Sequence, residues 1–103
     1  MIIINHIQIL ADAEYDLYEA RDFYDKQGKN IGDYFWDSIL SDIESLMIFV
    51  GVHKKDYGYY RMLAKRFPYA IYYDVNQDVA SVIAVLPLRR NPVWIKDKMS
   101  NRN

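Results

Sequence analysis

The periodicity of the apolar residues changes once along the chain, between residues 50 and 59, and this change most constrains the fold. Before it, apolar side chains recur at intervals of three and four residues, as on one face of a helix. After it, they form three strand-length segments that are rich in aromatic and β-branched residues. Two helices followed by three strands predict an α+β fold.

Two amphipathic helices are expected in the first half of the chain. The first covers residues 12–27, with Asp12 as its N-cap. Its apolar face consists of Ala13, Leu17, Ala20 and Tyr24. The second helix follows Asn30, and its apolar stripe consists of Trp36, Leu40, Ile43, Met47 and Val50, widened by Phe35, Ile39 and Leu46. Because the link between the two helices is short, they must lie antiparallel as a hairpin.

The second half predicts three antiparallel strands in one twisted sheet, over residues 59–67, 69–75 and 80–88. The short link at residues 76–78 favours a hairpin between the last two strands. The segment 80–88 is almost wholly apolar, which is typical of a central strand. Residues 1–10 lack a basic leader region, so we expect an N-terminal strand there rather than a signal peptide. A short tail follows residue 88.

Length and composition restrict the class of protein. A chain of 103 residues fits one domain, residues 1–103. It contains no cysteine and only two histidines, so we expect no cofactor, no metal site and a reducing compartment, the cytoplasm. No run of about 18 apolar residues occurs, and the sequence therefore predicts no membrane span.

The net charge of −1 hides a strong asymmetry between the two halves. Residues 1–50 contain three basic and ten acidic residues, a net charge of −7. Residues 51–103 contain ten basic and four acidic residues, a net charge of +6. One small fold built from both halves should have an acidic flank and a basic flank.

The cations of the second half are expected to form one concave basic patch. On an extended strand over 59–67, Arg61 and Lys65 share one face and Arg66 lies on the other. An unpaired cation in an apolar core is costly, so the face with two cations is solvated or meets an anion. Cations among aromatic side chains suit a nucleic-acid backbone or an acidic protein tail.

Two adjacent arginines, Arg89 and Arg90, follow the last strand, and Trp94 lies just beyond them. They would complete the basic patch. The alternative is a solvated strand end, with the arginines held by Asp74 or Asp78.

Three phrases of the sequence together resemble the RelE/ParE superfamily of bacterial type II toxins. They are ADAEYDLYEARDFYD at residues 11–25, LAKRFPYAIYYDV at 63–75 and IAVLPLRRNPVW at 83–94. The resemblance implies a helix hairpin packed on a twisted antiparallel sheet. It also implies a cognate antitoxin that wraps the toxin in a hetero-oligomer and neutralises it, in modules that include plasmid-stabilisation systems.

The superfamily divides into two mechanisms. RelE-like members are metal-independent endoribonucleases that cut mRNA on the ribosome, which requires a general base, a general acid and stabilisation of the phosphate. Arg61 and Lys65 lie near two of the basic strand positions of that branch. Arg89 lies near the arginine that ends its last strand. If the protein is an enzyme, these three residues form its catalytic set.

Other positions depart from the RelE pattern. Leu63 and Ala70 stand where a lysine and an arginine are expected, and Trp94 lies near the place of a tyrosine. This incomplete set favours the ParE-like branch, whose members poison DNA gyrase. Arg89, Arg90 and Trp94 would then contact the target or the antitoxin, as would Arg61, Lys65 and Arg66. A third hypothesis is a non-toxic interaction module that has kept the fold.

Overall fold

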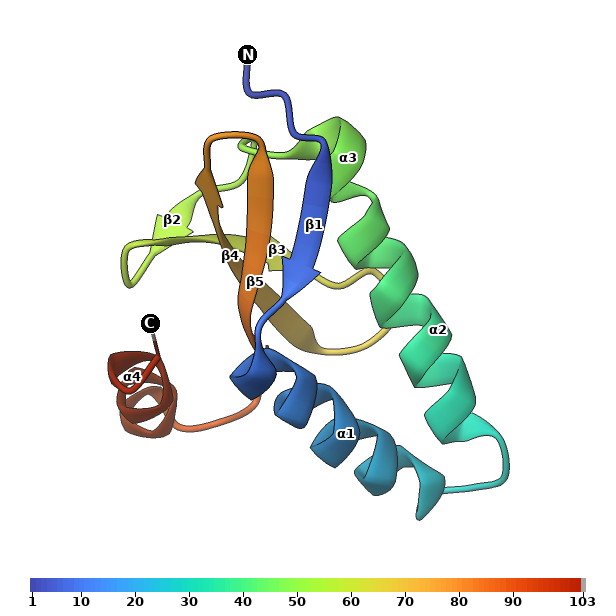
Figure 1. The fold of residues 1–103 in the computed structure, drawn as a ribbon. Helices are drawn as coiled ribbons and strands as arrows, with labels where there is room; N and C mark the ends of the chain where they lie inside the picture. The colour runs from blue at the N-terminus through green and yellow to red at the C-terminus, as the bar shows by residue number, and fades with distance from the viewer. Residues whose placement is uncertain (103) are drawn as a thin grey trace.

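The helices and strands follow the predicted order, with three short additions. A computed structural model describes residues 1–102. Its elements are β1 (His6–Ile9), α1 (Ala11–Asp25), α2 (Ile31–Glu44), α3 (Leu46–Phe49), β2 (Lys55–Asp56), β3 (Tyr59–Leu63), β4 (Tyr69–Asn76), β5 (Val79–Pro87) and α4 (Pro92–Ser100) (Figure 1). The additions are α3, β2 and α4. The predicted fold class is confirmed.

One five-stranded sheet forms the middle layer, in the order β1-β5-β4-β3-β2. β1 runs parallel to β5, and the other neighbours are antiparallel. Helices α1 and α2 lie on one side of the sheet and α4 lies on the other (Figure 1). β5 is the interior strand that the sequence predicts, but it lies between β1 and β4 rather than at the centre. In residues 1–102, no helix is long and apolar enough to cross a bilayer.

The predicted hairpin of the last two strands is present. Asn76 pairs with Val79, so Gln77 and Asp78 make the turn. Gln77 has a φ of 56° and so adopts the left-handed conformation that glycine usually supplies at such turns. Further along, the register shifts between Tyr72 and Tyr73, which leaves Ile83 of β5 unpaired in a β-bulge.

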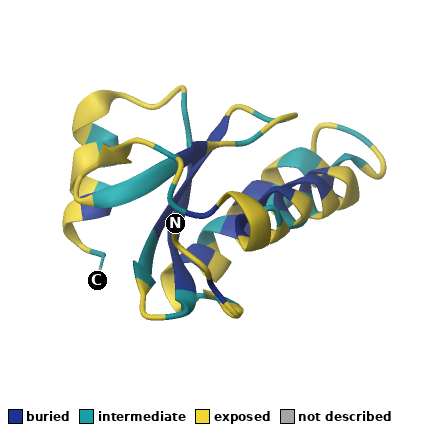
Figure 2. Cartoon of the chain, turned by 90° about the horizontal axis from the view of Figure 1, so that it is seen from above, coloured by how far each residue is buried: buried dark blue, intermediate teal, exposed yellow. Residues whose placement is uncertain are grey.

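Each face of the sheet has its own apolar cluster. On the side of α1 and α2, the largest buried members are Leu17, Phe35, Ile39, Leu46, Ile71 and Tyr73. On the side of α4, the buried members are Ala70, Tyr72, Ala84, Leu86 and Met99. Figure 2 shows the buried residues in the strands and along the inner sides of the helix hairpin. The sheet is therefore covered on both faces, which explains the apolar sequence of β5.

Two details of the predicted helices are wrong. The first helix begins at Ala11 with Leu10 as its N-cap, so Asp12 lies inside the first turn and does not cap it. In the second helix Phe35, Ile39 and Ile43 are buried as expected, but Met47 is 48% exposed. The helix breaks at Ser45, where α2 gives way to α3, and beyond the break Leu46 and Val50 are buried while Met47 is not.

Gly32 sets the distance between α1 and α2. A Cβ atom at this position would lie 2.0 Å from the carboxylate of Asp25 and 2.8 Å from the backbone oxygen of Arg21. We expect Gly32→Ala to destabilise the protein by about 1–3 kcal/mol, because the backbone of α1 must move, although alanine favours helix. Urea unfolding measures this cost.

Gly28→Ala is the matched control for Gly32→Ala. Its Cβ would meet only the end of the Ile31 side chain, at 2.8 Å, and that side chain can rotate away. The control should therefore change the free energy of unfolding much less. Equal effects of the two substitutions would contradict the close approach of the helices at Gly32.

Candidate target-binding cleft

A cleft of about 510 Å³ opens where α1, the start of β4, the end of β5 and α4 meet. Its cations are Arg89, Arg90 and Lys98. Its aromatic side chains are Phe23, Tyr24, Tyr69 and Trp94, and its carboxylates are Asp16 and Glu19. The cleft thus combines an apolar wall with three positive groups.

Strand pairing and a helix cap bring these residues together. Tyr69 at the start of β4 pairs with Pro87 at the end of β5. The N–H of Leu88 donates to the oxygen of Pro68 (2.8 Å), which extends this pairing by one residue. Asn91 then caps α4 by accepting a hydrogen bond from the N–H of Val93 (2.7 Å). Arg89 and Arg90 are therefore the exposed link between a strand and a helix.

Trp94 holds two of the cations in place. The guanidinium carbon of Arg90 lies 4.6 Å from the centre of the indole ring, and the Nζ of Lys98 lies 5.3 Å from it. Both distances are within the range of cation–π attraction. The indole therefore orients two positive groups at the mouth of the cleft without neutralising either of them.

The carboxylates of Asp16 and Glu19 also line the cleft, but neither forms an ion pair with its three cations. Within residues 1–102, the ion pairs are Arg21–Asp33 and Arg102–Asp16. The cations that line the cleft are thus available to an external anion.

The alternative in which Asp74 or Asp78 holds the arginine pair is wrong. Both acids lie near the turn between β4 and β5, at the opposite end of these strands from Arg89. Asp78 instead accepts a hydrogen bond from the side chain of Asn5 (3.0 Å).

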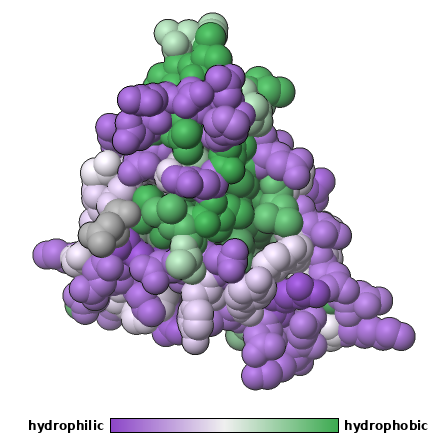
Figure 3. Space-filling model, viewed as in Figure 1, coloured by the Kyte–Doolittle hydropathy of each residue, from purple (hydrophilic) through white to green (hydrophobic). Residues whose placement is uncertain are grey.

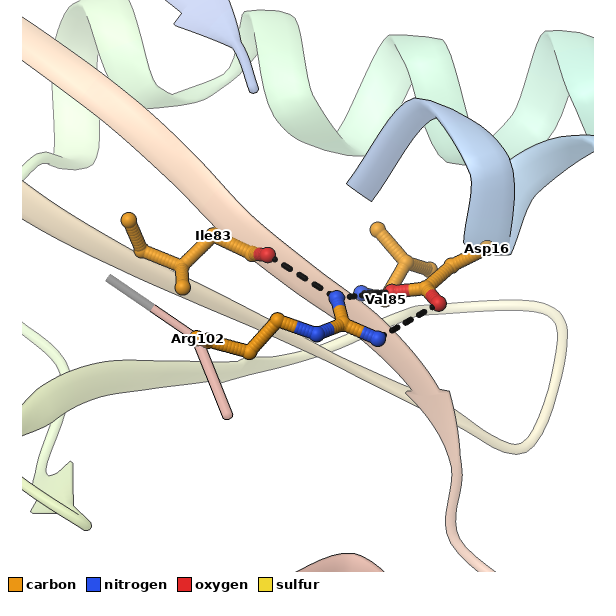
Figure 4. A network of polar contacts seen from close by, with 4 residues as sticks. All are labelled: Asp16, Ile83, Val85 and Arg102. Carbon is orange, nitrogen blue, oxygen red and sulfur yellow. Dashed lines mark hydrogen bonds and ion pairs between the residues drawn. The ribbon is translucent and has the colours of Figure 1, made fainter. Parts of the chain in front are cut away.

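A buried ion pair lies next to the cleft. Asp16 of α1 accepts two hydrogen bonds from the guanidinium of Arg102, at 2.7 and 2.9 Å, and a third from the N–H of Val85 (2.9 Å). Arg102 also donates to the oxygen of Ile83 (3.1 Å) (Figure 4). The hydrogen bond to Asp16 raises the pKa of Arg102 above its usual range. The N-terminal strand region pairs with β5 only as far as the hydrogen bond from the N–H of Leu10 to the oxygen of Val82. Beyond this bond, the Asp16–Arg102 pair occupies the free edge of β5.

The tyrosines of the cleft are poor proton acceptors. Burial and the nearby Tyr24 raise the pKa of Tyr69 to about 12, against the opposing charge of Arg90. Burial also raises the pKa of Tyr24, which the charge of Arg89 partly offsets. Both phenols are therefore protonated at neutral pH and can donate hydrogen bonds.

Only some of the residues predicted for the basic patch lie together in the structure. Arg89, Arg90 and Trp94 line the cleft, whereas Arg61, Lys65 and Arg66 do not. The predicted alternation of Arg61 and Lys65 on one strand face is wrong, because β3 ends at Leu63 and the next residues form a loop.

Each of these three residues has another environment. The Nε of Arg61 donates to the hydroxyl of Tyr72 (3.3 Å), on the α4 side of the sheet. Lys65 is exposed, and its backbone N–H donates to the buried carboxylate of Asp42 (3.1 Å). Arg66 is exposed in the same loop. Of the predicted cations, only Arg89 and Arg90 therefore line the cleft, and its third cation, Lys98, was not predicted.

The remaining candidate groups for chemistry lie elsewhere. His53, in the loop after α3, has its Nδ1 2.5 Å from the hydroxyl of Tyr73, and burial lowers the pKa of this histidine. It does not line the cleft. In residues 1–102, no three histidine or carboxylate side chains lie close enough to hold a metal ion.

The sequence did not point to several residues of this region, which include Asp16, Glu19, Phe23, Tyr24, Lys98 and Arg102. Lys98 could have been found, because Asn91-Pro92 is a helix-start signal and Trp94 and Lys98 then share one helix face. No sequence signal pairs Arg102 with Asp16, which is 86 residues away.

Comparisons with known proteins bear on the fold. No protein-family model matches the sequence. No curated protein matches it either. Among solved structures, the chain is similar to one described as the chromosomal ParDE TA system from P. aeruginosa, with a TM-score of 0.75 and 14% sequence identity. The match covers 84% of this chain and 98% of that chain. At this identity the likeness concerns architecture, and it agrees with the helix hairpin and sheet order: the chain has the RelE/ParE-like fold.

Proposed function

We propose that this protein is the toxin of a type II toxin-antitoxin module, and that it binds DNA gyrase in the bacterial cytoplasm until a cognate antitoxin neutralises it. The observation that carries the proposal is the cleft lined by Arg89, Arg90 and Lys98, in which Trp94 lies against the last two and none of the three cations is ion-paired to a described carboxylate. The similar solved structure is described as a ParDE TA system, which supports an antitoxin partner.

The chemistry of the cleft suits binding to an acidic or phosphate-bearing surface. Arginine presents a planar set of donors that matches carboxylate and phosphate oxygens. The apolar wall offers a place for an aromatic or aliphatic group beside the anion. Because Arg89 and Arg90 are exposed, the affinity for such a target should fall as the salt concentration rises.

The same cleft is poorly suited to cutting RNA. A metal-free cleavage needs a group that removes the 2′-hydroxyl proton. The arginines stay protonated, and the raised pKa values of Tyr24 and Tyr69 keep their phenols protonated too. The endoribonuclease hypothesis requires Arg61, Lys65 and Arg89 to act together. These residues lie apart: Arg61 is on β3, Lys65 is in the loop after it, and Arg89 is in the cleft. We therefore favour target binding over catalysis.

Induction in bacteria, followed by a supercoiling assay with purified gyrase, tests the proposal. We expect growth arrest, rescue by co-expression of the adjacent small reading frame, and inhibition of supercoiling. Arg89→Ala combined with Arg90→Ala should weaken inhibition by at least about tenfold, because each lost charge-assisted hydrogen bond costs about 1.5–3 kcal/mol. The matched control is Lys26→Ala combined with Lys29→Ala, which removes the same charge from the far end of the hairpin.

Three outcomes would contradict the gyrase proposal. Full gyrase activity at saturating protein would exclude this target. Codon-phased mRNA ends after induction would instead support the endoribonuclease. Binding to the product of the adjacent reading frame without any growth arrest would support a non-toxic interaction module.

A further inference from the structure

β1 leaves one side of its backbone unpaired. It is the first strand in the sheet order, so only β5 pairs with it. The N–H groups of His6 and Leu10 donate to the oxygens of Asp78 (3.2 Å) and Val82 (3.0 Å) on the β5 side. Because backbone groups alternate along a strand, the N–H and C=O of Ile7 and Ile9 point away from β5. Within residues 1–102, neither residue has a backbone hydrogen bond outside the β1–β5 ladder.

β1 also lacks the charged and proline side chains that protect many edge strands. Its sequence, HIQI, contains no lysine, proline or acidic residue. The opposite edge, β2, has only Lys55 and Asp56, both charged and exposed. Short, charged edges resist pairing with another chain, whereas an uncharged edge invites it. The two edges of the sheet therefore differ in a way that favours strand addition at β1.

An uncharged surface surrounds this edge. We call it the uncharged edge, and it comprises residues 2–11 and 45–53, which contain no Lys, Arg, Asp or Glu. α3 packs beside β1, and the side chain of Ile2 lies against Gly51. Its most exposed apolar side chains are Ile3 (72%), Ile48 (78%) and Val52 (71%). Figure 3 shows apolar side chains at the N-terminal end and at the centre of this face.

We propose that a second copy of this chain pairs with β1, antiparallel and about a two-fold axis at Gln8. A two-fold interface places the same patch of each copy opposite itself. α1 and α2 together carry ten acidic residues, of which only Asp16 and Asp42 have buried side chains, and one arginine, so this surface would repel its own copy. The uncharged edge is the surface on which this repulsion is absent.

The register follows from the alternation of the backbone. With Gln8 on the axis, Ile7 of each copy lies opposite Ile9 of the other, and each such pair exchanges two hydrogen bonds. The sheets of the two copies become continuous. The exposed apolar side chains of residues 2–3 and 47–49 would be buried at the flanks. None of the residues that line the cleft belongs to the uncharged edge, so this inference does not depend on the proposed target.

Sedimentation equilibrium of the purified full chain, over a wide range of concentration, tests the pairing. We expect a reversible dimer. Gln8→Lys should weaken it by at least about tenfold, because it sets two ammonium groups on directly opposite residues whose Cα atoms are about 4.5 Å apart. Leu63→Lys is the matched control: it adds the same charge at another exposed position, on β3, and should leave the dimer intact.

Hydrogen exchange of the unmodified protein gives a second measurement that does not depend on a variant. The amides of Ile7 and Ile9 should become more protected as the concentration rises. A monomer at every concentration would overturn the proposal, as would a dimer that Gln8→Lys leaves unchanged in a folded variant. Protection of these two amides only after a strand from another protein is added would also overturn it, because that result assigns the edge to a different occupant.

Discussion

Replacing Asp16 with alanine is expected to destabilise the protein by about 3–5 kcal/mol. The substitution leaves the guanidinium of Arg102 without its partner at a site where that side chain is only 8% exposed. It also removes the acceptor for the N–H of Val85 in β5. The midpoint of urea unfolding, followed by circular dichroism, measures the loss, and a change below about 1 kcal/mol would contradict the buried ion pair.

Two further variants separate charge from hydrogen bonding at this site. Asp16→Asn keeps an acceptor oxygen for Val85 but loses the charge, so it should cost less than Asp16→Ala. In the combination of Asp16→Ala with Arg102→Ala no unpaired charge remains, so its cost should be smaller than the sum of the two single costs. A cost equal to that sum would mean that the two side chains act independently.

Replacing Phe35 with alanine is expected to cost about 3–5 kcal/mol as well. Phe35 is fully buried, and its ring packs against Tyr24, Phe67 and Tyr69, with centroid distances of 5.0 to 5.1 Å. These contacts join α2 to α1, to the loop before β4 and to β4 itself. The cavity left by the ring cannot be refilled without moving several elements, and urea unfolding should show the full loss.

Phe23→Ala is the matched control for Phe35→Ala. It removes the same side chain from α1, but Phe23 is 54% exposed, so little apolar area is lost from the interior. The control should cost less than about 1 kcal/mol. Tyr24 and Tyr69 also line the cleft, so Phe35→Ala should loosen the wall of the cleft as well. An equal loss of stability in the two variants would contradict the central place of Phe35 in the core.

The sequence was sufficient for the order of the elements and for the helix hairpin, because both depend on local periodicity. It was insufficient for the limits of β3. The segment 59–67 has the composition of one strand, but β3 stops at Leu63, where the chain turns before Pro68. Strand ends depend on pairing with residues far along the chain, here β4, and no local pattern reports that pairing.

The candidate site could also be predicted only where it depends on residues that are close in the sequence. Arg89, Arg90 and Trp94 were placed correctly near one another because they are close in the sequence. Arg61 was expected in the same patch, yet it contacts Tyr72 on the α4 side of the sheet. No sequence pattern indicates the role of Arg102, because that role depends on where β1 ends and on the stretch of β5 that is left without a strand partner.

The position of β5 between β1 and β4 affects when the protein can reach its native state. Gln8 on β1 and Ser81 on β5 are separated by 73 residues, and Asp16 and Arg102 by 86. Contacts this distant in sequence form late, and a nascent chain emerges from the ribosome N-terminus first. β1 and the acidic helices therefore cannot complete their contacts until β5 has been synthesised. The cleft, which requires β5 and α4, can form only after both of these elements have emerged from the ribosome.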